Sequence, residues 1–504
     1  MRKRWLKLAA VPVALAFVAA SCSTEDEGGS SGGDSSTTAG EDAGTTTADE
    51  GTTADEGTTA DEGTTADEGT TADEGTTADE GTTADEGTTG SGGGDVALEG
   101  TEVVVFGSES SDVEAGAMQD ALNIFAEENS MTVTFVGARD FEEQINSQVS
   151  GGNAPDIAIF PQPGKLAGFA DSGDLFPVPE DVVASVDANW GDAWMEFWQV
   201  DGVQFGVPVK SDLKSLVWYS PAAFAEKGYE VPETLDDFFA LTEEMIAAGD
   251  TPLCVGIESG PATGWPFTDW TEELVLRNEG LDYYNQWVAH EVPFNDPPVV
   301  DAMTQISDLW AADGAVYAAG GSIAATPFGD NGPSLTEGQC MMHRQANFFA
   351  SFFPAGTEFG DGPGAIDTFY FPSNEGAPIL VAGTAAASFR DAPEVWAVME
   401  YYGSPEYADN RQVAQLARLE AEPGGDVVSG YLSANENANQ DNYSALEQGF
   451  LEVLATGEPA GFDASDQMPA EVGSGTFWRE ATALVNGEKD AAAAADGIES
   501  SWPS

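Results

Sequence analysis

The chain has 504 residues, and its 88 Asp and Glu against 16 Lys and Arg give a formal net charge of −72 at pH 7. So negative a chain is a poor partner for nucleic acids and for anionic lipid surfaces. Its two histidines, His290 and His343, leave almost no material for a histidine-based metal site. We therefore expect no nucleic-acid partner, no metal and no cofactor.

The amino terminus is typical of an export signal. Basic residues precede an apolar run from Leu8 to Ala20, which is too short to span a bilayer. The run leads into "AASC", which resembles the cleavage box of bacterial lipoproteins, although Ala19 stands where that box more often has leucine. The resemblance implies that residues 1–22 are a lipoprotein signal with its box, and that the Cys22 thiol is acylated. Ordinary secretion with a chance cysteine is the alternative.

Residues 23–95 differ in composition from the rest of the chain. This segment has no Lys, Arg or aromatic residue, and "TTADEG" repeats within it from Thr46 to Gly87. Such a tract has nothing to bury and repels itself, so we predict a disordered acidic tether that holds a folded domain away from the membrane. No later stretch has the unbroken apolar residues of a membrane span, so lipid is the only expected attachment.

Strands and helices alternate after the tether. Buried strands are predicted over Thr101–Gly107, Val133–Gly137 and Asp156–Phe160. The segments between them have the apolar spacing of amphipathic helices. This alternation predicts an α/β fold with a parallel, doubly wound sheet, in which ligands gather outside the carboxyl ends of the strands. Glu109 and Gln162 follow two of these strands.

A second α/β series follows. A helix is predicted over 231–249, a strand over Pro252–Glu258, and a further helix around Leu309 and Trp310. Thr268 or Asp269 is predicted to cap a helix that begins near Trp270. Two α/β lobes, with the chain passing between them more than once, are the economical arrangement.

Two cysteines, Cys254 and Cys340, remain in the part predicted to fold. An even pair in an oxidising exterior favours a disulfide between them. Two buried thiols are the alternative.

Four segments resemble a known family. They are "SGGNAPDIAIF" (150–160), "GVPVKSDLKSLVWYSPAAFAEKGYEVPETLDDFF" (206–239), "EGQCMMHRQANFF" (337–349) and "DQMPAEVGSGTFWREATALVNG" (466–487). In this order, behind a lipoprotein signal, they are similar to extracellular solute-binding proteins, family 1, of carbohydrate-uptake ABC transporters. The likeness is greatest to the members that handle α-glucosides, and it covers nearly everything after the tether.

The resemblance implies a type II periplasmic binding protein fold, with two doubly wound lobes joined by a hinge. Lobe 1 is expected over 96–210 and 375–408, and lobe 2 over 211–374 and 409–504. The lobes would close on a sugar and deliver it to ABC permease subunits, without catalysis and so without catalytic residues. We expect a monomer at the extracellular face of the cell membrane.

Aromatic side chains supply the first candidate ligand contacts, because a ring can cover the C–H face of a sugar. Trp265 lies between Gly264 and Pro266, which predicts an irregular surface loop and favours a ligand platform. Trp270 shares a helical face with Leu274, so a core position competes with ligand contact. In "GSGTFW", Phe477 or Trp478 could stack on a ligand, or both could be buried at a helix start.

Polar groups of side chains and backbone supply the other candidates, because sugar hydroxyls need carboxylates, amides and similar partners. We expect ligand contacts from Glu109, Gln162, Asp212, Asp269, Arg344, Gln345, Gly383 and Thr384. A solvated side chain is the alternative for most of them, and a salt-bridge hub for Arg344. Lys210 and Lys214 are open between ligand contacts and surface ion pairs.

Three other functions compete with sugar capture. The same fold could bind a different solute, such as a polyamine, given so acidic a chain. A surface glycoside hydrolase would need paired carboxylates, which this composition makes unavoidable and therefore uninformative. A purely structural surface lipoprotein would show no ligand-dependent rise in melting temperature.

Overall fold

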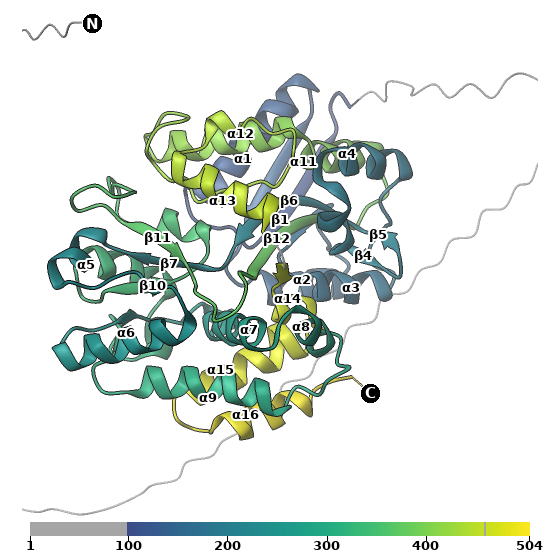
Figure 1. The fold of residues 1–504 in the computed structure, drawn as a ribbon. Helices are drawn as coiled ribbons and strands as arrows, with labels where there is room; N and C mark the ends of the chain where they lie inside the picture. Colours follow the sequence, from purple (N-terminus) through teal and green to yellow (C-terminus); the bar gives the residue numbers. More distant parts are fainter. Residues whose placement is uncertain (1–97, 458–459, 504) are drawn as a thin grey trace, which may run out of the picture. The chain divides into compact units, whose positions relative to one another are not determined.

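The computed structural model describes residues 98–457 and 460–503, so the predicted signal, Cys22 and the tether lie outside the described residues. Two sheets organise the described part of the chain (Figure 1). We call them sheet 1 and sheet 2. Sheet 1 contains β1 (Glu102–Gly107), β2 (Thr132–Gly137), β3 (Ile157–Phe160), β6 (Gly206–Leu213), β12 (Ile379–Ser388) and β13 (Ala460–Phe462).

The first three strands of sheet 1 are parallel to one another. β1 pairs in parallel with β2 and β3, as the alternating series predicts. The late strand β12 then lies antiparallel to β3 and β6 and parallel to β13. The carboxyl ends of β1, β2 and β3 therefore share one edge of the sheet, where ligands of open α/β sheets bind.

Sheet 2 is smaller and mixed. Its order is β11 (Asp367–Tyr370), β7 (Leu216–Tyr219), β10 (Met342–Arg344), β8 (Leu253–Cys254) and β9 (Val316–Tyr317). β7 is antiparallel to both neighbours, and β8 is parallel to β10 and β9. A separate hairpin joins β4 (Gln199–Val200) to β5 (Val203–Gln204).

Helices cover both sheets. Those packed around sheet 1 are α1 (Glu114–Glu128), α2 (Phe141–Ser150), α3 (Pro163–Asp171), α4 (Glu180–Glu196), α11 (Pro393–Tyr402) and α12 (Pro405–Arg418), the last lying on α1. Those around sheet 2 are α5 (Pro221–Lys227), α6 (Leu235–Ala248), α7 (Trp265–Glu279), α8 (Leu281–Val288), α9 (Pro297–Ala311), α10 (Asn331–Thr336), α15 (Trp478–Val485) and α16 (Ala491–Glu499). α13 (Ala445–Thr456) and α14 (Ala464–Gln467) lie late in the chain, and Figure 1 shows α9, α15 and α16 side by side.

Three hydrophobic cores hold these layers together. One lies between β1, β2, α1, α4 and α11, and a second surrounds α7. The third contains residues of both sheets, including Phe160 and Trp218. The two halves of the described chain therefore share apolar contacts as well as covalent connections.

Two connections join the sheets, and a third leads from sheet 1 to the helices at the end of the chain. The first is Lys214–Ser215, between β6 and β7, and the second is 371–378, between β11 and β12. The third leaves β13 at Asp463 and enters α14. All three lie beside α7: Lys214 donates to Asp269, Arg277 donates to the Phe371 carbonyl oxygen, and the Ser465 N–H donates to Glu272.

The predicted start of α7 is wrong. The helix begins at Trp265, with Gly264 as its N-cap, so Thr268 and Asp269 lie inside it and cap nothing. A proline is tolerated in the first helical turn, where its missing N–H is not needed, and Pro266 therefore opens the helix instead of marking a loop. The strand predicted over Pro252–Glu258 is also shorter, with only Leu253–Cys254 paired as a strand.

A disulfide joins Cys254 in β8 to Cys340 just before β10, with Cα atoms 5.4 Å apart. Both cysteines belong to the sheet 2 side of the molecule. Among the described residues no helix combines the length and the apolar character that a bilayer span requires.

Candidate functional site

A cavity of about 480 Å³ opens where the carboxyl ends of β1 and β3 face the start of α7. On the sheet 1 side the cavity is lined by the loop after β1, the turn after β3, and the middle of β6 and β12. On the other side it is lined by α7, the segments around Phe328 and Phe348, and the third connection. Its volume falls within the roughly 300–1,000 Å³ range of small-molecule sites.

Aromatic rings form one wall of this cavity. The Trp265 ring lies 5.2 Å from that of Phe328 and 6.1 Å from that of Phe348, centroid to centroid. The Lys214 ammonium lies 5.7 Å from the centroid of the Trp265 ring, and the Lys210 ammonium lies 5.5 Å from that of the Phe348 ring. Trp478, at the start of α15, also lines the cavity.

Gly264 makes this wall possible. Its φ of +118° is a conformation that other residues rarely adopt. A Cβ atom at this position would lie 2.2 Å from the Trp478 carbonyl oxygen. Only glycine therefore lets the start of α7 approach α15 closely enough for Trp265 and Trp478 to face one cavity.

Strand β6 supplies the charged floor. Alternate residues of a strand share a face, so Lys210 and Asp212 both reach the cavity. Lys210 Nζ lies 3.2 Å from Glu109 Oε1 and 3.5 Å from Asp212 Oδ2, and Arg411 Nη2 donates to Glu109 Oε2 at 2.9 Å. Burial alone would lower the pKa of Lys210, but the carboxylates of Asp212 and Glu109 raise it. Lys210 is thus held charged as a buried ion pair.

Three oxygen atoms on the sheet 1 side can accept hydrogen bonds from a guest. Gln162 Oε1, Asp212 Oδ1 and Thr384 Oγ1 are buried and have no hydrogen-bond partner among the described residues. All three side chains line the cavity. Leaving a buried acceptor unpaired costs about 1–3 kcal/mol. A bound molecule with hydroxyl donors would recover that cost.

A carboxylate cluster closes the cavity near the third connection. Oxygen atoms of Asp269, Glu272 and Asp463 lie within 4.8 Å of one another, a spacing that could hold a metal ion. The Lys214 ammonium already donates to Asp269 Oδ1 at 2.9 Å and to Asp463 Oδ2. Burial would lower the pKa of Lys214, but these two carboxylates raise it well above its usual value. The cations that partly neutralise this cluster therefore belong to the chain itself: Lys214 and, at Asp269 Oδ2, Arg344.

Glu272 is left out of this neutralisation. It is fully buried; its Oε1 accepts from the Ser465 N–H at 3.1 Å, and its Oε2 has no partner among the described residues. Burial, followed by the neighbouring carboxylates of Asp463 and Asp269, raises the pKa of Glu272 well above its ordinary 4.5. Burial and these neighbours therefore favour the protonated form of the Glu272 side chain in the folded protein.

Replacing Glu272 by glutamine should flatten the pH dependence of stability. In the unfolded chain the group ionises near pH 4.5, whereas its raised pKa lets the folded protein hold the proton to higher pH. Its contribution to stability is therefore full below pH 4.5 and is lost as the pH rises, by up to about 1.4 kcal/mol per pH unit. Glutamine cannot ionise, so the variant should lose less stability than the wild type between pH 5 and 8 in urea titrations. Glu279→Gln, an exposed change in the same helix, is the control, and parallel curves for Glu272→Gln and wild type would contradict the assignment.

The structure brings most of the predicted site residues together. The cavity is lined by Glu109, Gln162, Asp212, Trp265, Asp269, Gly383, Thr384 and Trp478. Trp265 reaches it from the first turn of a helix and not from a loop. Lys210 and Lys214 also line it, but as buried ion pairs and not as surface ones.

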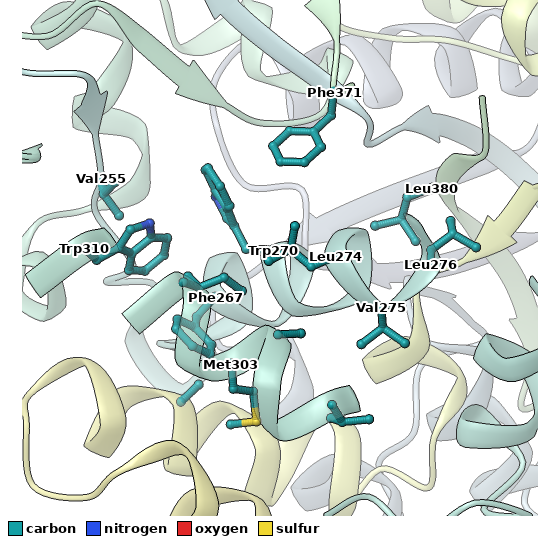
Figure 2. Close-up of a cluster of buried hydrophobic side chains, with 14 of the residues drawn as sticks. Val255, Phe267, Trp270, Leu274, Val275, Leu276, Met303, Trp310, Phe371 and Leu380 are labelled. Carbon is teal, nitrogen blue, oxygen red and sulfur yellow. The ribbon is translucent and has the colours of Figure 1, made fainter. Parts of the chain in front are cut away.

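Four predicted residues do not line the cavity. Trp270 lies in the core around α7, with its ring 5.9 Å from Trp310 and 5.4 Å from Phe371 (Figure 2). Phe477 is fully buried, 4.8 Å from the Phe294 ring. Arg344 and Gln345 are buried at the end of β10, where Arg344 Nη1 donates to Asp269 Oδ2 at 3.0 Å. The core needs the two apolar rings, buried carboxylates need the guanidinium, and Gln345 Oε1 accepts from the Ala346 N–H, so none of the four faces the cavity.

The sequence reasoning missed several lining residues. The largest omissions are Phe328 and Phe348 in the ring wall, Asp463 in the carboxylate cluster, and Asp466 three residues after it. Phe348 stands in "HRQANFF", a few residues after Arg344 and Gln345, which were both predicted to contact the ligand. The remaining missed residues include Glu114, Arg139, Glu142, Phe352 and Ser465.

Comparisons with known proteins agree with this architecture. The sequence profile described as "Bacterial extracellular solute-binding protein" matches residues 109–409. The osmoprotective compounds-binding protein GgtB of Synechocystis sp. is 38% identical over 77% of this chain and 89% of its own. The alpha-glucosides-binding periplasmic protein AglE of Rhizobium meliloti is 34% identical over 81% of this chain and 88% of its own.

A solved structure is similar at the level of the fold. The bacterial solute receptor AcbH superposes with a TM-score of 0.66 at 19% identity, over 79% of this chain and 98% of its own. With the pairing of the two sheets, this likeness confirms the predicted α/β fold class.

Proposed function

The chain belongs to the bacterial extracellular solute-binding proteins, and from this premise we propose that it captures a neutral sugar or glycoside, of the α-glucoside type, for import. In this proposal the two lobes close on the guest and present it to the permease subunits of an ABC transporter. Cys22 would carry the lipid that holds the protein at the extracellular face of the membrane. The protein would bind its guest without cleaving it.

The observation that carries this proposal is the pairing of a ring wall with a row of acceptors. Trp265, Phe328 and Phe348 offer apolar faces, while Gln162, Asp212 and Thr384 offer oxygen atoms from the opposite sheet. A sugar has apolar C–H faces and a rim of hydroxyl groups, which these two surfaces match. GgtB and AglE are named for binding osmoprotective compounds and α-glucosides, which supports the same class of guest.

The charges of the cavity argue against an anionic guest. Carboxylates outnumber cations in the lining, with Glu109, Glu114, Glu142, Asp212, Asp269, Asp463 and Asp466 against Arg139, Lys210 and Lys214. Lys210 and Lys214 are already paired with carboxylates. A phosphate or sulfate would therefore meet repulsion with little compensation. A neutral guest meets none, and a polyamine is the charged competitor that the test must include.

A binding panel tests the proposal. We expect maltose, trehalose or a related glycoside to raise the melting temperature, because a ligand at about 100 times its Kd adds about 2.7 kcal/mol of stability. Calorimetry would give the affinity, and chromatography of the sugar after incubation would show it intact. Spermidine and inorganic phosphate are the matched comparisons. Binding of spermidine alone, or release of glucose from maltose, would overturn the proposal.

A further inference from the structure

Helix α7 carries a line of charges through the interior. Asp269, Glu273 and Arg277 are spaced by four residues, so they lie on one face of the helix over about 12 Å. Every residue from Pro266 to Arg277 is buried. One end of this line touches the cavity, and the other meets the second connection between the sheets.

At the cavity end, Asp269 is held from two sides. Its Oδ1 accepts from Lys214 Nζ at 2.9 Å, and its Oδ2 accepts from Arg344 Nη1 at 3.0 Å. Lys214 belongs to the first connection, and it also donates to Asp463 at the start of the third. A guest in contact with Asp269 therefore meets a carboxylate tied to two connections.

In the middle of the line, Glu273 links Arg344, which holds Asp269, to the first connection and to Arg277. Its Oε2 accepts from Arg344 Nη2 at 2.5 Å, and its Oε1 accepts from Ser215 Oγ at 2.7 Å and from Arg277 Nη1. Ser215 is the second residue of the first connection, and its Oγ also accepts from the Leu380 N–H at 2.7 Å. Glu273 thus holds the first connection against the beginning of β12.

At the far end, the Arg277 side chain donates hydrogen bonds to the backbone of the second connection. Its Nε and Nη2 donate to the carbonyl oxygen atoms of Phe371, Pro372 and Pro378 at 2.9–3.1 Å. Its guanidinium also lies 5.2 Å from the Phe371 ring centroid. A planar fork with five donors can hold both ends of this segment at once, which an ammonium cannot.

We propose that Arg277 is a positioning residue for ligand capture, which sets affinity by fixing the connections around which the two lobes move. The residues of such connections absorb the backbone rotation when lobes close. With Arg277 in place, the first and second connections are cross-braced through Glu273 and Ser215. Without that brace the free protein samples more lobe arrangements, and a guest must bear the cost of restricting them. The inference rests on the proposed function for its effect on affinity.

The test is Arg277→Lys, which keeps the charge beside Glu273 and removes the fork. In ligand-free protein, small-angle scattering should show a larger radius of gyration and a broader distance distribution than in wild type. The Kd for maltose or trehalose, whichever wild type binds, should rise about five- to tenfold. Arg277→Met is the second variant, and it should move both readouts further in the same direction.

A matched control separates positioning from general destabilisation. Phe294→Leu thins the core around α7 and α9 without touching the cavity or any connection. It should lower the melting temperature while leaving the scattering profile and the Kd unchanged. If Arg277→Lys behaves like Phe294→Leu in scattering, the inference is overturned, whether or not any sugar binds. If wild type binds no glycoside but the scattering difference appears, the proposed function fails and the brace stands.

Discussion

Replacing Arg344 by methionine is expected to destabilise the protein by about 3–5 kcal/mol, the usual cost of removing one partner from a buried ion pair. The Arg344 side chain is almost completely buried, and it donates to Asp269 and Glu273, which are equally buried. Methionine fills much of the space but cannot neutralise a charge. Two carboxylates in the interior then lose their shared cation, and the free energy of unfolding measured in urea should fall accordingly.

Arg418→Met is the control for this change. Arg418 pairs with Asp120, but both side chains are well exposed, so the loss should stay below about 1 kcal/mol. Adding Glu273→Gln to Arg344→Met should restore part of the lost stability, because the remaining buried cations, Lys214 and Arg277, then face one carboxylate fewer. Equal losses for Arg344→Met and Arg418→Met would show that the buried ion pairs around α7 contribute no more than surface ones.

Trp265→Ala should weaken binding of any glycoside found in the panel by about 1–3 kcal/mol, the range for deleting a well-placed ring contact. Trp265 is the ring that faces both Phe328 and Phe348, so its removal opens the middle of the ring wall. Calorimetry on wild type and variant measures the difference directly.

Two further variants sharpen this prediction. Trp265→Phe keeps an apolar face and should retain most of the affinity. Trp502→Ala removes a ring that stacks on His290, away from the cavity, and should leave affinity unchanged. An affinity for Trp265→Ala equal to that of Trp502→Ala would return Trp265 to the role of a scaffold residue.

The sequence alone predicts the strands and helices whose signals lie in neighbouring residues. The strands after the tether follow from short apolar runs and appear with nearly the predicted bounds, and the segments between them form helices, as their apolar spacing predicts. The start of α7 was misjudged because Gly264 and Pro266 are also common in loops. What decides their role is the close approach of α15 to Gly264, which comes from more than two hundred residues along the chain.

The candidate site could be predicted only where residues follow predicted strands. Glu109 and Gln162 were found in this way, and both line the cavity. Arg344 was correctly recognised as a possible salt-bridge hub, but nothing local indicates that its partners are Asp269 and Glu273. In a chain so rich in carboxylates, pairing depends on which ones the fold buries together. Phe348 was missed for a similar reason, because several phenylalanines follow one another and only packing decides which faces the cavity.

The burial of α7 has an evolutionary consequence. Its residues from Pro266 to Arg277 supply the surrounding hydrophobic core, the interior ion pairs and the hydrogen bonds to the second connection, with no solvent-facing position among them. Substitutions there are expected to be purged by selection even when the cargo changes. Homologues that bind a different ligand should therefore differ first in the loop Ser108–Ser111 and around Gln162. An alignment of many homologues would show more substitutions there than in α7.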